Sequence, residues 1–185
     1  MSPHAPFITQ ARVMQFTDPK SAIITKLAAN SFLACRVALI NEVAGDAVGA
    51  DIERVRTGLA SDPRIGDLFL YAGPGYGGSC FGKDIRALGE SARQHGLGCS
   101  LIPAIEESNN RHKLHVPQQV ERYFGSVAGK TIAVWGIAFK ARTDDIRESP
   151  AVDAIEAARK RSDPGARSRG ATAIRGTVRQ QDQAF

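Results

Sequence analysis

Residues 21–48 read SAIITKLAANSFLACRVALINEVAGDAV and form the longest periodic stretch of this 185-residue chain. Apolar residues recur at steps of three and four, which predicts one long α-helix and a mainly helical fold around it. Lys26 and Asn30 stand one turn apart on that helix, on neighbouring positions of one face. The apolar neighbours of Asn30 indicate an inward-facing amide that needs a partner. The alternative is a solvent-exposed lysine beside an incidental asparagine.

Downstream, residues 73–84 read GPGYGGSCFGKD and place Cys80 directly after a glycine-dense turn. Glycine lets the backbone approach a ligand closely, because it has no Cβ. A helix that begins near Cys80 would favour the thiolate through its positive end. Asp84, one turn further on, would orient or deprotonate a water. A buried inert cysteine is the alternative, and the glycine cluster favours the reactive one.

Two better-known motifs overlap this turn, and both are interpreted as accidental. Gly73, Gly75 and Gly78 satisfy the GxGxxG pattern, but no clean strand precedes them and no acid follows about twenty residues on. Residues 77–83 satisfy GxxxxGK, but Asp84 stands where a P-loop needs Ser or Thr.

Three further helices are predicted after the long one. They cover residues 51–59, 84–95 and 102–124, the last with an interruption near Pro117. His112 and His115 are assigned to the surface, because no third ligand stands at metal spacing, and no metal site is expected.

At residues 131–135 the apolar run TIAVW predicts a buried parallel strand, followed by a helix from about Ala151 with Pro150 as its first residue. Strand, loop and helix are the opening of a nucleotide-binding α/β unit. After about Arg159 the chain is rich in Arg, Ser, Gly and Gln without a period, which indicates disorder or a reading-frame shift.

Composition narrows the function classes. No run of 18 apolar residues and no signal-peptide pattern is present, so no membrane span or export is expected. Three widely spaced cysteines argue against a disulfide framework and fit a reducing cytoplasm. From Arg159 onward seven bases against two acids account for the whole net charge of +5, so a general nucleic-acid surface is not expected.

Four blocks together resemble the UDP-glucose/GDP-mannose dehydrogenase family, and most closely its UDP-glucose 6-dehydrogenase branch. They are KLAANSFLA at 26–34, DPRIG at 62–66, GYGGSCFGKD at 75–84, and GIAFK at 136–140 with TDDIRESPA at 143–151. The resemblance covers about residues 16–158. It implies an N-terminal Rossmann domain for NAD, a central helical dimerisation domain and a C-terminal UDP-binding domain.

On that resemblance the chain is a mainly α central dimerisation domain followed by the truncated start of an α/β Rossmann-like nucleotide-binding domain. Residues 1–17 are an irregular remnant of something upstream, and residues 18–126 are the central helical dimerisation and catalytic domain. The NAD domain is missing from the chain. Residues 127–160 begin the UDP-binding domain, and 161–185 form a disordered or frame-shifted tail. The expected form is a homodimer through the long helix.

The family's activity is an NAD-dependent, two-step oxidation of the C6 alcohol of UDP-glucose to a carboxylate. The resemblance implies that Cys80 is the nucleophile, that Asp84 activates the hydrolytic water, and that Lys26 and Asn30 stabilise the C6 oxygen. It implies further contacts with the UDP-sugar from Phe69, Leu70, Tyr71, Ala72, Gly73, Gly77 and Lys140. Arg64 would reach the partner's substrate, and Lys83 and Arg147 would contact NAD.

Two positions depart from the family pattern: Gly82 stands where proline is usual, and Ile23 and Ile24 stand where an acidic residue is usual. GDP-mannose or a UDP-aminosugar remains an alternative substrate. Two other functions also stay open. One is a non-catalytic dimerisation or regulatory module, and the other is a cysteine hydrolase.

Overall fold

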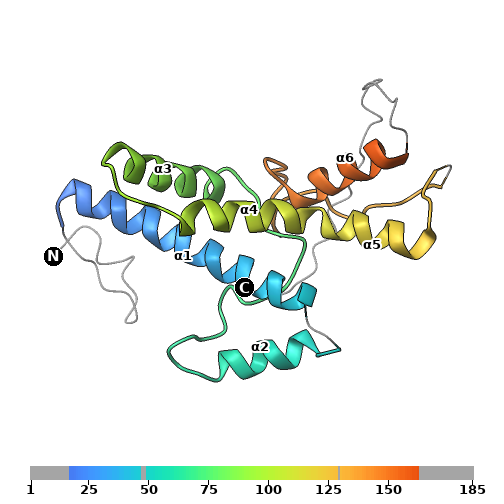
Figure 1. Cartoon of the computed structure of the whole chain (residues 1–185), viewed down its shortest axis with the longest axis horizontal. Helices are drawn as coiled ribbons and strands as arrows, with labels where there is room; N and C mark the ends of the chain where they lie inside the picture. Colours follow the sequence, from blue (N-terminus) through green and yellow to red (C-terminus); the bar gives the residue numbers. More distant parts are fainter. Residues whose placement is uncertain (1–16, 47–48, 129, 163–185) are drawn as a thin grey trace.

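The computed structural model describes residues 17–46, 49–128 and 130–162, and in these ranges it contains six helices and no strand (Figure 1). The helices are α1 (Pro19–Asp46), α2 (Ile52–Ala60), α3 (Phe81–Gln94), α4 (Leu101–Lys113), α5 (His115–Phe124) and α6 (Pro150–Ser162). The expectations for the two ends, 1–17 and 161–185, fall largely outside the described residues.

Helix α1 is the longest helix among the described residues, and three other helices pack against it. Helices α3 and α4 pack along one side of it, α2 lies on the other side, and α5 and α6 extend beyond one end of the bundle (Figure 1). The buried cluster between α1, α3 and α4 consists of Ala34, Ala38, Ile85 and Ile105. The two alanines stand one turn apart, so α3 and α4 approach α1 closely. Burial of each isoleucine stabilises the fold by about 1.5–3 kcal/mol.

By length and composition alone, residues 19–45 could cross a membrane. Their contacts favour the core helix of a folded domain instead. Asn41 on α1 is almost fully buried and accepts a hydrogen bond from the Gly73 backbone, and Lys26 forms an ion pair with α3. A helix that carries these polar links to its neighbours is part of one packed unit.

The helix predictions are confirmed in kind and corrected at some boundaries. Helix α3 begins at Phe81, three residues earlier than predicted, with Cys80 as its N-cap residue. The break in the last predicted helix falls at Leu114, not near Pro117. Pro117 lies in the first turn of α5, where a missing backbone N–H costs no helical hydrogen bond.

The strand predicted at residues 131–135 is wrong, because these residues are irregular and their side chains are exposed. Trp135 is 97% exposed, and Ile132 and Val134 are also exposed. A strand needs a neighbour to satisfy its backbone groups, and no second strand lies among the described residues. Of the predicted α/β opening, the structure therefore has the helix α6 and not the strand.

Candidate active site

The Cys80 thiol lies at the N-terminal end of α3. Cys80 is the N-cap residue, its side chain makes no cap hydrogen bond, and it is solvent-exposed. Its backbone carbonyl accepts the Asp84 N–H at 2.9 Å, which starts the helix. The first N–H groups of a helix lack intrahelical partners, so the sulfur lies at the positive end of α3.

Asp84 is the centre of a polar cluster between α1 and α3. Its carboxylate accepts a hydrogen bond from Asn30 Nδ2 at 2.6 Å and pairs with Lys26 Nζ at 3.0 Å. Asp84 is 4% exposed, and burial alone would raise its pKa. The hydrogen bond from Lys26 outweighs that effect and lowers the pKa of Asp84 below its usual value. Asp84 is thus the partner that the sequence predicted for Asn30.

The glycine-dense turn approaches other parts of this chain. A Cβ at Gly75 would meet Asn109 Oδ1 at 2.8 Å, and one at Gly78 would meet the Phe139 ring at 2.6 Å. A Cβ at Gly77 would collide with the Glu148 backbone carbonyl. The turn is therefore packed against α4 and residues 139–148, and Gly75 and Gly78 also have positive φ angles.

Residues 69–73 form a loop held between α1 and α4. Asn41 accepts the Gly73 N–H at 2.9 Å, and the ring nitrogen Nε2 of His112 bonds the Gly73 carbonyl at 2.8 Å. Leu70 is buried, and the Phe69 ring packs against Phe81 at 6.2 Å between centroids. The segment predicted to line the sugar nucleotide thus has a defined backbone position.

Two other side chains of this loop region face different surroundings. Tyr71 is exposed and stacks under the Arg56 guanidinium at 4.5 Å, and Ala72 is half-buried. The loop therefore offers both buried and accessible groups.

Sequence reasoning missed three residues that hold these loops: Asn41, Asn109 and His112. His112 was assigned to the surface, but it is half-buried, and its burial lowers the pKa of the imidazole. Asn41 falls in the apolar periodicity of α1, a signal that would have marked it as buried. The contacts of Asn109 and His112 join segments more than thirty residues apart, and nothing local indicates them.

The remaining predicted residues are charged and exposed. Arg147 pairs with Asp145 in the loop before α6, and this pair is the main reason why the pKa of Arg147 is raised. The Arg147 carbonyl accepts the Gly78 N–H at 2.9 Å, so this residue lies beside the turn that leads to Cys80. Lys83 is exposed on the first turn of α3, next to Asp84. Lys140 lies over the Phe139 ring at 5.4 Å.

Arg64 does not join this group. It pairs with Asp62 at 2.6 Å and is 88% exposed. It follows α2, which lies on the opposite side of α1 from α3 (Figure 1). The structure therefore leaves Arg64 available to another molecule.

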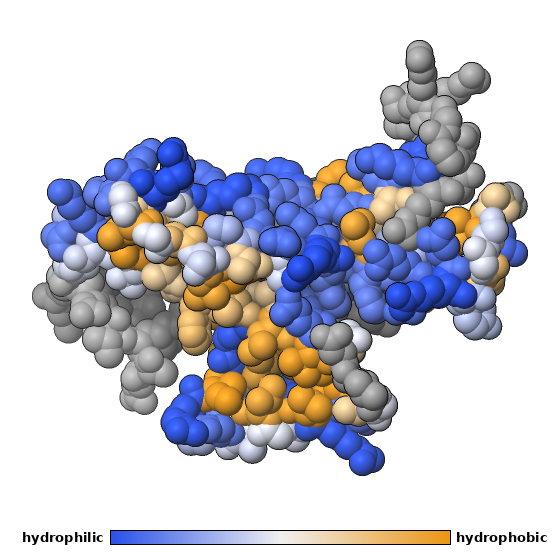
Figure 2. Space-filling view, viewed as in Figure 1, coloured by the Kyte–Doolittle hydropathy of each residue, from blue (hydrophilic) through white to orange (hydrophobic). Residues whose placement is uncertain are grey.

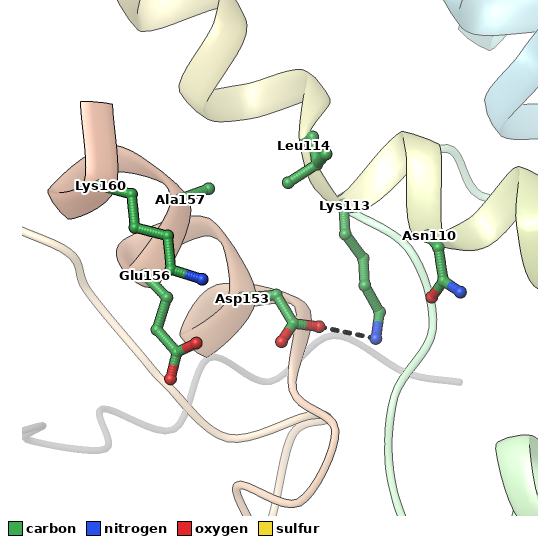
Figure 3. Close-up of a pocket in the computed structure, with 7 residues that line it drawn as sticks. All are labelled: Asn110, Lys113, Leu114, Asp153, Glu156, Ala157 and Lys160. Carbon is green, nitrogen blue, oxygen red and sulfur yellow. Dashed lines mark ion pairs between the residues drawn. The ribbon is translucent and has the colours of Figure 1, made fainter. Parts of the chain in front are cut away.

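Two ion-pair groups join α3 and α4 to α6 and to the segment that leads into it. Arg86 bonds both Glu106 at 2.6 Å and Glu148 at 2.9 Å. Lys113 pairs with Asp153 at 2.7 Å, at the edge of an open cavity of about 480 Å³ between α4 and α6 (Figure 3). Within the described residues no group of three His, Cys, Asp or Glu side chains could hold a metal ion.

Comparison with known proteins assigns the family. Residues 20–111 match the central domain of the UDP-glucose/GDP-mannose dehydrogenase family, and residues 133–168 match the UDP binding domain of the same family. The chain belongs to this family. The candidate residues of α1, α3 and the loop between α2 and α3 lie within the central-domain match, and Lys140 and Arg147 lie within the UDP-binding match.

Several dehydrogenases of this family are similar over most of the chain. The UDP-glucose 6-dehydrogenase of Pseudomonas aeruginosa is 45% identical over 157 residues, which are 83% of this chain and 35% of that protein. The UDP-glucose 6-dehydrogenase TuaD of Bacillus subtilis is 44% identical over 154 residues, 82% of this chain and 33% of that protein.

A solved structure shows the same fold. The UDP-glucose dehydrogenase of the archaeon Pyrobaculum islandicum superposes with a TM-score of 0.75 at 34% identity, covering 79% of this chain and 34% of that chain. This family member thus spans about a third of the length of the relatives that it matches.

Proposed function

We propose that this chain carries the thiol-bearing catalytic centre of an NAD-dependent UDP-glucose 6-dehydrogenase. The observation that carries the proposal is the cluster of Lys26, Asn30 and Asp84 between α1 and α3, with Cys80 at the start of the same helix as Asp84. The similarity to UDP-glucose 6-dehydrogenases supports the choice of substrate. The proposed location is the cytoplasm.

In the proposed reaction the C6 alcohol of the sugar is oxidised first to an aldehyde and then to a carboxylate. Lys26 and Asn30 donate hydrogen bonds to the C6 oxygen as negative charge develops there. Lys26 is suited to this role because its side chain is 66% exposed while its ammonium already points into the cluster. It can therefore shift from Asp84 to a substrate oxygen without leaving a core position.

Cys80 acts in the second oxidation. Its thiolate adds to the aldehyde carbon to form a thiohemiacetal, whose oxidation yields a thioester, and water then hydrolyses the thioester and releases the thiol. Asp84 is held ionised by Lys26 and Asn30, so it accepts a hydrogen bond from that water and orients it. The exposed position of the sulfur leaves it accessible to a substrate.

NAD⁺, when bound, accepts the hydride in each of the two oxidations. The residues around this end of α3 fit an anionic dinucleotide, because both Lys83, on the first turn of α3, and Arg147, beside the turn before Cys80, are exposed cations. These two residues would hold its phosphates.

The proposed sugar-nucleotide contacts come from residues 69–73, Gly77 and Lys140. The fixed backbone of the 69–73 loop supports the first of these. Lys140 offers an exposed ammonium to the phosphates. GDP-mannose and UDP-aminosugars remain the alternative substrates, since the family name itself joins two sugar nucleotides.

The test is a chimera in which this chain replaces the matched 157 residues of the Pseudomonas aeruginosa relative. With UDP-glucose and NAD⁺ the chimera should form UDP-glucuronate and two NADH per sugar. Cys80→Ala should abolish acid formation, and Cys99→Ala serves as the matched thiol control. A folded chimera that binds UDP-glucose but forms no NADH would refute the proposal. Turnover of GDP-mannose but not of UDP-glucose would assign GDP-mannose as the substrate.

A second candidate is a dimerisation module without its own activity. It is favoured by exposed apolar side chains along α1, including Ile23, Ile24, Phe32 and Leu39. The same surface would serve the proposed homodimer, in which Arg64 reaches the partner's substrate. Co-purification with a full-length relative, without any effect of Cys80→Ala on the chimera, would favour this candidate.

A cysteine hydrolase is disfavoured by the histidines that the structure describes. His95 bonds the Ser91 carbonyl, His112 bonds the Gly73 carbonyl, and His115 bonds Gln119. A hydrolase would need one of them beside the thiol as its base.

A further inference from the structure

Among the buried polar side chains of helix α4, two contact the glycine turn or the segment that faces it, and no step of the proposed reaction uses them. They are Asn109 and Lys113, which stand one turn apart and are 3% and 8% exposed. Side chains four residues apart lie on the same helical face. Buried polar groups of this kind are retained where their hydrogen bonds hold a specific arrangement.

Asn109 forms two hydrogen bonds with the backbone of one residue in the glycine turn, Tyr76. Its Oδ1 accepts the Tyr76 N–H at 2.9 Å, and its Nδ2 donates to the Tyr76 carbonyl at 3.0 Å. A side chain at Gly75 would collide with this amide. The Tyr76 ring in turn packs edge-on against Phe81, with the ring centroids 5.6 Å apart. Phe81 is the residue after Cys80, so the contacts of Asn109 are connected through Tyr76 to the start of α3.

Lys113 holds the segment that faces the turn. Its ammonium pairs with Asp153 and donates to the Glu148 carbonyl at 3.4 Å, and Figure 3 shows the side chain pointing toward Asp153. The carbonyl of the preceding residue, Arg147, accepts the Gly78 N–H at 2.9 Å. Helix α4 therefore holds the glycine turn through Asn109 and the segment packed against this turn through Lys113.

We propose that Asn109 and Lys113 are positioning residues that set the environment of the Cys80 sulfur by fixing the turn before it and the Arg147 backbone that bonds this turn. They act through Tyr76 and Glu148 and not on the substrate. If either is removed, the turn and Arg147 can move apart, and the groups around the start of α3 are no longer held in place beside the sulfur.

The test measures the alkylation rate of each cysteine by iodoacetamide, using peptide mass spectrometry on the chain. Asn109→Ala and Lys113→Met should slow alkylation of Cys80 at neutral pH by about twofold to fivefold and move its half-maximal rate to higher pH. Cys35 and Cys99 in the same molecules should keep their rates. Asn110→Ala is the matched control, because Asn110 is the exposed neighbour on the same helix.

Far-UV circular dichroism establishes first that each variant keeps its helix content. If Asn109→Ala unfolds, the alkylation rate of Lys113→Met tests the proposal instead. This variant keeps an apolar side chain of similar length to the lysine stem. An unchanged Cys80 rate and pH profile in the folded variant would overturn the inference. So would equal acceleration at all three cysteines, because that indicates general loosening.

The inference rests on the proposed function only in giving the thiol a catalytic role. Alkylation requires neither a sugar nucleotide nor NAD. A failed turnover experiment with the chimera and a failed alkylation experiment are therefore distinguishable.

Discussion

Asp84 determines how the polar cluster between α1 and α3 behaves. A nearly buried carboxylate is expected to resist ionisation, and the hydrogen bonds from Lys26 and Asn30 reverse that tendency. An acid with a lowered pKa is a weak base and a good hydrogen-bond acceptor. Asp84 is therefore better suited to orienting a water than to removing its proton completely.

The cluster predicts a pH dependence of stability. The pKa of Asp84 is lowered in the folded chain, so the unfolded chain binds more protons as the pH falls. The stability that Asp84 contributes is fully present above its unfolded value of 3.8 and is lost as the pH falls through the folded value. Urea unfolding of the wild type and of Asp84→Asn, at neutral pH and at several acidic pH values, measures this.

At neutral pH Asp84→Asn should lower the free energy of unfolding by about 1.5–3 kcal/mol, since a hydrogen bond to a charged group is lost. The gap between the two proteins should shrink below pH 4, whereas a general defect would leave it unchanged. Asp144→Asn, at an exposed carboxylate, is the control. A gap that stays constant with pH would contradict the prediction.

The turn between the 69–73 loop and α3 depends on close packing against residues 139–148. Among its glycines, Gly77 lies against the Glu148 backbone, while Gly73 has open space where a Cβ would stand. A backbone atom cannot move aside as the end of a flexible side chain can. The two positions therefore respond differently to the same added methyl group.

Gly77→Ala should destabilise the chain by about 1–3 kcal/mol, because the new Cβ collides with the Glu148 carbonyl. Gly73→Ala, the matched control, should change stability by less than about 0.5 kcal/mol. Thermal unfolding followed by circular dichroism compares them. Equal melting temperatures for the two variants would show that the turn does not pack as described.

Helix α1 carries apolar side chains on more than the face that it buries within the chain. Ala34, Ala38 and Ile40 are buried, whereas Phe32 and Leu39 are exposed. Figure 2 shows hydrophobic side chains gathered where α2 lies against α1. Apolar surface of this extent along one helix is typical of an interface, and the proposed homodimer would cover it.

A charge on this face should weaken the proposed dimer. Phe32→Lys should raise the dimer dissociation constant at least about tenfold, since burial of a phenylalanine contributes about 1.5–3 kcal/mol. Leu97→Lys introduces the same charge at an equally exposed apolar residue outside α1 and should have a smaller effect. Sedimentation equilibrium gives both constants. A wild-type chain that stays monomeric at high concentration would rule out the interface.

Residues 131–135 are irregular and exposed, and their exposure can be measured through the tryptophan that they contain. Trp135 is the single tryptophan of the sequence and is 97% exposed. Its fluorescence should resemble that of the urea-unfolded chain in wavelength, and acrylamide should quench both to the same degree. A blue-shifted, protected emission at native conditions would mean that the segment is covered, for example by a strand partner.

Much of this protein follows from the sequence alone. Helical periodicity and Pro150 at a helix start are local signals, so the helices were predicted to within a few residues. The spacing of Cys80 and Asp84 on one helix is equally local. The four sequence blocks identified the family, which comparison with known proteins confirms.

Only the tertiary structure decided which side chains meet. Asp84 pairs with Lys26 and Asn30, which lie more than fifty residues away in the sequence. Asn109 bonds the backbone of Tyr76, which lies thirty-three residues away. Such contacts depend on how α1, α3 and α4 pack, which no local pattern encodes. The run at 131–135 fails as a strand for the same reason: its side chains favour β structure, but a strand exists only with a partner, and the described residues contain none.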